Sequence, residues 1–148
     1  MVCACAVVVA VSTLHVVNRT GQPQINLPRT SLLAVPAYIY VQVATTPAQR
    51  DVGLMFRKQL PPDDEMLFVF NKPRVQCFWM RNTPLPLAAA FIASDGTIMN
   101  LADMAPETTS SHCSVRPVRF VLEMNQGWFA QRAIKAGFKL RGEPFKSR

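Results

Sequence analysis

The residue types best suited to chemistry in this chain fall in one short stretch, residues 77–86, which reads CFWMRNTPLP. Trp79 offers an apolar wall, while Arg81, Asn82 and Thr83 offer hydrogen-bonding groups, and small-molecule pockets combine these two features. Asn and Thr before a proline also form ordinary turns, because their side chains bond to nearby backbone groups. The stretch is therefore either the rim of a pocket or the end of a strand that runs into a turn. The sequence leaves both interpretations open.

A second candidate group is Glu123, in a segment where apolar and polar residues alternate. Its neighbours Leu122 and Met124 are apolar, so strand geometry directs the carboxyl group to the opposite face. An inward-facing carboxylate needs a charged partner, and Arg50 or Arg81 would serve. Two roles follow: a structural ion pair, or an acid–base group beside an anion held by Arg81 and Asn82.

Several kinds of site have no support in the sequence. No hydrolase triad signature or phosphate-binding glycine loop is present. His112 and Cys113 are only sequence neighbours, and no Cys-x-x-Cys or His-x-x-x-His spacing indicates zinc. Together with nearby methionines these two residues could bind copper(I), but methionines usually fill cores. We expect neither a metal nor a cofactor.

The N-terminal residues indicate export. The first seventeen residues carry no charge except what His15 could acquire, and Val2 to Val11 form an apolar run of signal-peptide length. The run has no preceding Lys or Arg, and a buried N-terminal strand is the alternative interpretation. We expect a signal segment at 1–17, a polar linker at 18–30, a single domain at 31–148, and a periplasmic or secreted protein.

Cysteine usage agrees with export. Removal of a signal segment leaves only Cys77 and Cys113, an even pair that could form a disulfide in an oxidising compartment. Two separate buried thiols are the alternative.

Hydrophobic patterning predicts a strand-rich α+β domain. We expect strands at 37–44, 66–70, 75–80, 87–93, 97–101, 118–124 and 138–140, and helices at 47–55 and 128–136. Gly53 is expected to allow another backbone segment to approach, and Gly137 to end the second helix. The predicted architecture is a small, partly closed β-barrel or curved sheet with about two short helices.

The net charge of +7 arises partly from a basic C-terminal segment. A solvated basic face is the simplest explanation, and an anionic surface is the alternative partner. Because no nucleic-acid-binding signature is present, we expect no nucleic-acid partner.

Four sequence blocks resemble the domain of unknown function 192 family of bacteria and archaea: residues 49–57, 66–70, 78–87 and 122–127. The resemblance covers about residues 31–141 and implies a compact, mostly β domain that is commonly exported. It implies no established activity. Ala88 follows Leu87 where the family often has an aspartate, so no acid–base role for that carboxylate can apply to this chain.

These observations favour a monomeric, exported, non-enzymatic module that binds a small molecule or an envelope component. The expected site combines the strand end at Trp79, Arg81, Asn82 and Thr83 with Arg50 and Glu123. The alternative is a small hydrolase or transferase in which Glu123 acts as the acid–base group and Arg81 and Asn82 hold an anion.

Overall fold

A computed structural model describes residues 21–146, so the predicted signal segment at 1–17 lies outside the described residues. The strands are β1 Arg29–Ala34, β2 Ala37–Ala44, β3 Met66–Arg74, β4 Cys77–Phe78, β5 Leu87–Ile92, β6 Ile98–Met104, β7 His112–Cys113, β8 Val118–Asn125 and β9 Arg141–Gly142. The helices are α1 Pro47–Val52 and two 3-10 turns, η1 Ala130–Arg132 and η2 Glu143–Phe145.

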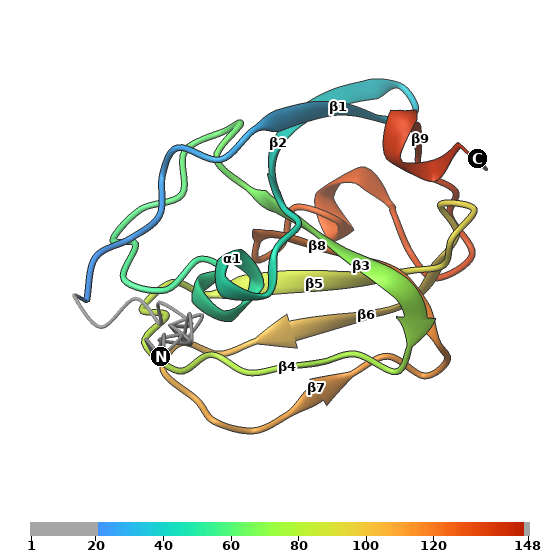
Figure 1. Cartoon of the computed structure of the whole chain (residues 1–148). Coiled ribbons are helices and arrows are strands. Elements are labelled where there is room, and N and C mark those ends of the chain that lie inside the picture. The colour runs from blue at the N-terminus through green and yellow to red at the C-terminus, as the bar shows by residue number, and fades with distance from the viewer. Residues whose placement is uncertain (1–20, 147–148) are drawn as a thin grey trace, which may run out of the picture.

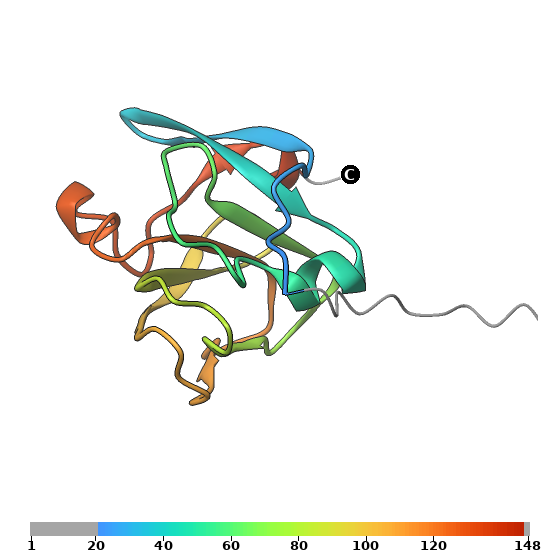
Figure 2. The same cartoon turned by 90° about the vertical axis from the view of Figure 1, so that its left-hand side faces the viewer.

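Seven strands form one sheet in the order β6-β5-β8-β3-β2-β1-β9. All neighbours are antiparallel except β2 and β3. Parallel strands need a crossover connection, and here it contains α1. The sheet curls into half a barrel, with the β1–β2 hairpin at one end and a separate β4–β7 ribbon at the other (Figures 1 and 2). This is the strand-rich, curled sheet with few helices that the patterning predicts.

Both faces of the sheet are buried, each against its own core. Strand β5 shows this directly, since all six of its residues are buried. On the adjacent β8, Leu122 and Met124 join one core and Val121 joins the other. Glu123 therefore points to the second face, as the alternation predicts. That face is covered by Leu54, which follows α1, and by Phe78 of the ribbon.

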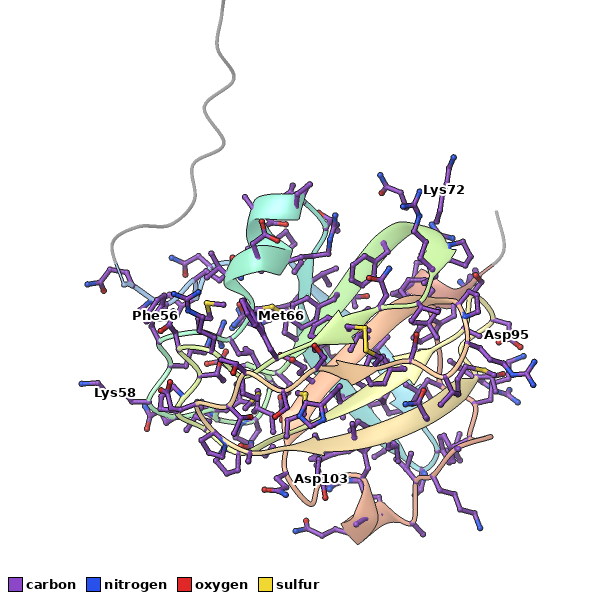
Figure 3. The ribbon with its side chains drawn as sticks, turned by 90° about the horizontal axis from the view of Figure 1, so that it is seen from below. Phe56, Lys58, Met66, Lys72, Asp95 and Asp103 are labelled. Atoms are coloured by element: carbon purple, nitrogen blue, oxygen red, sulfur yellow. A yellow bond between two sulfur atoms is a disulfide. The ribbon has the colours of Figure 1, made fainter. Side chains whose placement is uncertain are left out.

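The predicted buried strand at 75–80 is wrong. Only Cys77 and Phe78 adopt strand geometry, and they pair with β7 rather than with the main sheet. Trp79 keeps 48% of its surface exposed, whereas Met80 is buried. The apolar composition reflects a short ribbon lying over the sheet, with one side against the core and the other in solvent. The Cys77–Cys113 disulfide joins its two strands and is drawn as a yellow bond in Figure 3.

The two predicted helices differ from the structure in length. Helix α1 begins with the expected capping box between Thr46 and Gln49 but ends at Val52, not at 55. Its C-cap Gly53 has φ 49°, and the ring of Phe68 packs against it. The close neighbour is thus a side chain, not a second backbone.

The predicted helix at 128–136 is replaced by the single 3-10 turn η1. Trp128 and Phe129 pack edge to face, and Phe129 and Ile134 bury themselves in the first core. Packing of these side chains holds the segment in irregular turns. The expected strand at 138–140 is likewise displaced: Lys139 forms only a bridge to Thr97, and β9 follows it.

Part of the predicted linker is packed on the domain. Strand β1 begins at Arg29 and was not predicted, because its apolar residues Leu32, Leu33 and Ala34 are consecutive and do not alternate with polar ones. The side-chain amide of Gln24 donates to the carbonyl oxygens of Gln49 and Gly53. The buried guanidinium of Arg57 donates in turn to the Gln24 carbonyl and to Gln42 Oε1. These contacts tie residues 24–30 to α1 and β2.

Loss of the disulfide is expected to lower stability. The two cysteines are 36 residues apart, and the chain-entropy model gives about 4 kcal/mol for a loop of this length. We expect the double variant Cys77→Ser/Cys113→Ser to lose about 2–4 kcal/mol in urea denaturation, and wild type in reductant to match it. Alkylation of the denatured, unreduced protein followed by peptide mapping tests whether the bridge exists. Quantitative labelling of Cys77 and Cys113 would show that it does not.

Candidate functional site

A cavity of about 390 Å³ lies between α1, strand β3 and the β4–β7 ribbon, on the second face of the sheet. The residues that line it are Arg50, Asp51, Val52, Gly53, Leu54, Met55, Phe68, Phe70, Gln76, Cys77, Phe78, Trp79, Thr83 and Glu123. The volume is within the range of small-molecule sites. Met66, at the start of β3, lies close to α1 in Figure 3, whereas Lys72 lies near the strand's other end.

Glu123 lines the cavity from the middle of the sheet. Its strand partners are Met66 on β3 and Ala89 on β5, and the residue is only 4% exposed. Among the described residues, the carboxyl group makes no hydrogen bond or ion pair, and burial alone raises its pKa to about 8. At neutral pH the group is therefore mostly a neutral acid. Its isolation makes it the chemically most unusual residue in the cavity.

The charged partner expected for Glu123 is absent from the described residues. Arg50 lines the same cavity but its guanidinium donates to the carbonyl oxygens of Thr45 and Val69, at 2.9 Å for the latter, and lies 4.9 Å from the Phe70 ring centroid. These contacts hold Arg50 against β3. Arg81 lies over Trp79 instead, with 5.8 Å between guanidinium and ring centroid. The proposed structural ion pair is therefore wrong.

The apolar wall is a cluster of aromatic rings centred on Phe78. Its ring packs edge to face against Phe68, Phe70 and Phe91, with centroids 4.8, 6.5 and 6.2 Å apart. Phe68, Phe70 and Phe78 line the cavity, while Phe91 is fully buried behind it. The short β4–β7 ribbon thus brings its aromatic residue over the sheet.

The stretch from Trp79 to Thr83 is both a turn and part of a pocket wall. Trp79 and Thr83 line the cavity, and Thr83 is 5% exposed. Arg81 and Asn82 are not among the lining residues. Asn82 has φ 55°, and its carbonyl accepts a hydrogen bond from the Phe56 amide, so it serves the turn. Of the six predicted site residues, the structure brings four together: Arg50, Trp79, Thr83 and Glu123.

Sequence reasoning missed four polar and aromatic residues of the site. Phe68 and Phe70 were assigned only to a core strand, and Asp51 and Gln76 had no assigned role. Asp51 carried no sequence signal, because consecutive residues of a helix do not lie on the same face. The position of Gln76 depends on the β4–β7 ribbon, which no local pattern indicates.

Two further observations bear on the kind of site. Within residues 21–146, no group of three or more His, Cys, Asp or Glu comes together where it could hold a metal ion. In the same part of the chain, no helix has the length and apolar character needed to cross a membrane.

Fold and cavity together define a class of protein: a strand-rich, curled half-barrel that carries a small pocket on the second face of its sheet. Residues 33–142 match the DUF192 family, described as "Uncharacterized ACR", and the chain belongs to that family.

Two solved structures are similar to the chain. One is a protein from Sinorhizobium meliloti 1021 whose description proposes a role as a transcription regulator; it is 37% identical, with a TM-score of 0.74, and the match covers 84% of this chain and 99% of that one. The other is a protein of unknown function from Novosphingobium aromaticivorans DSM 12444; it is 30% identical, with a TM-score of 0.71, over 82% of this chain and 94% of that one. None of the curated proteins compared with the chain matches it significantly.

The isolation of Glu123 predicts a pH-dependent stability. Its folded-state pKa of about 8 lies above the ordinary value of 4.5, so the folded state keeps a proton that the unfolded state loses. The contribution of Glu123 to stability is therefore fully present below about pH 5 and is lost at roughly 1.4 kcal/mol per pH unit between about pH 5 and pH 8. Glu123→Gln should lose this contribution, so its stability should fall less steeply than that of wild type in urea denaturation across the range.

The exposed Glu143 provides the matched control, because Glu143→Gln also removes one carboxyl group. This control should keep the wild-type slope. Parallel stability curves for wild type and Glu123→Gln would contradict the raised pKa.

Proposed function

We propose that this protein is a non-enzymatic binding module, and that the cavity on the second face of its sheet holds a small molecule. The observation that carries the proposal is Glu123, a buried carboxyl group without a protein partner, at the wall of a cavity of about 390 Å³. A buried polar group without a partner is costly, and a bound ligand can remove that cost.

The rest of the lining suits a ligand with an apolar body and a polar end. Phe68, Phe70 and Phe78 offer apolar contact, while Thr83 and Glu123 offer a few directed polar groups. Binding pockets commonly have this division. The disulfide beside Phe78 holds the outer wall in place without the ligand, which reduces the ordering cost of binding.

The alternative, a small hydrolase or transferase, has one observation in its favour. A carboxyl group with a pKa of about 8 is protonated at neutral pH and could act as a general acid. Against it, Arg81 and Asn82, the proposed anion holders, do not line the cavity. Only Glu123 remains of the predicted catalytic set, and the loss of both anion holders favours binding over turnover.

For the cellular setting we propose export, based on the uncharged, apolar first seventeen residues and the Cys77–Cys113 disulfide, since such bridges persist in oxidising compartments. An envelope component remains a candidate ligand source, and the basic residues could contact an anionic surface. The regulator role proposed for the Sinorhizobium protein is not extended to this chain. Within residues 21–146 the single α-helix has six residues, too few for a helix-turn-helix.

A pocket-filling variant tests the proposal. Val52 lines the cavity from α1, whereas Ala48 on the same helix is exposed and does not. We expect protein purified from its native host to retain a small molecule detectable by native mass spectrometry. Val52→Trp should lose it because the indole occupies the cavity, and Ala48→Trp should keep it.

Equal retention by the two variants, or no retained molecule in wild type, would contradict the proposal. Incubating the isolated ligand with fresh protein distinguishes the enzyme alternative. Binding predicts recovery of an unchanged mass, whereas a product that Glu123→Gln fails to form would support catalysis.

A further inference from the structure

The electrostatic surroundings of Glu123 indicate what kind of group belongs beside it. Its strand neighbours Met66 and Ala89 carry no charge. Within residues 21–146, the only other ionisable side chains that line the cavity are Arg50 and Asp51 of α1. Neither side chain shifts the pKa of Glu123, which burial alone raises. Arg50 is held by the carbonyl oxygens of Thr45 and Val69. The cavity thus contains an acidic group whose countercharge is missing among the described residues.

The walls of the cavity also favour positive charge. Aromatic rings carry negative potential on their faces and attract cations. Two of the lining rings already do so, because Arg50 lies over Phe70 and Arg81 lies over Trp79. Phe68 and Phe78 line the same space with no such cation over them among the described residues. The Thr83 hydroxyl oxygen, which also lines the cavity, can accept a hydrogen bond from a ligand.

We propose that the cavity recognises an organic amine, bound as an ammonium ion that pairs with the Glu123 carboxylate among the rings of Phe68 and Phe78. The inference rests on the proposed binding function and names its ligand class. A neutral ligand that accepts a hydrogen bond from protonated Glu123 is the competing chemistry.

The two chemistries differ in the direction of proton movement. Below about pH 8 the free protein holds a proton on Glu123, so an ammonium ion can pair with the carboxylate only if that proton leaves. The charged side chains that face Glu123 from the elements packed against it are Arg50 and Asp51 of α1. Amine binding therefore releases a proton and strengthens as pH rises. Binding of a neutral acceptor needs the proton and weakens as pH rises.

Benzylammonium and benzyl alcohol provide a matched pair of probes that differ in the charged group. For wild type we expect benzylammonium to bind more tightly, at roughly millimolar dissociation constant or better. Its affinity should rise about tenfold from pH 6 to pH 7 and level off above about pH 8. A pH-stat at pH 7 should record nearly one proton released per amine bound. Calorimetry in phosphate, which contains no competing amine, gives the affinities.

Variants test separately whether the ligand is an amine and whether it binds in this cavity. Glu123→Gln should weaken benzylammonium at least tenfold while changing benzyl alcohol by no more than about twofold. Val52→Trp should weaken both probes, and Ala48→Trp neither. Tighter binding of benzyl alcohol, absence of proton release, or no benzylammonium binding at ten millimolar would overturn the amine inference. If the amine inference fails but benzyl alcohol binds and Val52→Trp abolishes that binding, the proposed binding function is still supported. If Val52→Trp also retains the native ligand as well as wild type does, the proposed binding function is wrong too.

Discussion

The requirement to bury both faces of one curled sheet governs the rest of this structure. Central strands β5 and β8 are covered on both sides, so each residue on them must suit one of two cores. On β8, Leu122 and Met124 enter the first core and leave position 123 facing the second. A glutamate there is almost entirely buried, and its side chain faces only the cavity. Its carboxyl group becomes isolated because the sheet places it in the interior.

The second core is not closed completely, and the opening is the cavity. Helix α1 is only six residues long, and the β4–β7 ribbon has two residues per strand. These two small elements cover the sheet only in part. The disulfide between Cys77 and Cys113 holds the ribbon, and with it the ring of Phe78, over the face that contains Glu123. A disulfide-held wall, an apolar lining and the buried carboxyl group of Glu123 therefore meet at one place.

Much of the fold could be predicted from local patterns. Strand β2 has the predicted bounds, β5 and β8 lie within one residue of theirs, and α1 has the expected cap, because alternation and capping are local properties. Errors occurred where packing outweighs local preference. Residues 75–80 look like a core strand in composition, yet their partner β7 lies more than thirty residues along the chain, at Cys113. The segment at 128–136 contains aromatic residues whose burial favours turns over a helix.

The sequence by itself determined which residues of the candidate site carry unusual chemistry. It identified Trp79, Thr83, Arg50 and Glu123, the face to which Glu123 points, and the Cys77–Cys113 pair. Only the tertiary structure decided how these groups relate to one another. Among the described residues Glu123 has no charged partner, because the Arg50 guanidinium donates to backbone carbonyl oxygens. Arg81 and Asn82 lie in the turn after Trp79, outside the cavity lining. The physical reason is that charge pairing and desolvation depend on distances between strands that are remote in sequence, whereas side-chain direction depends on the strand alone.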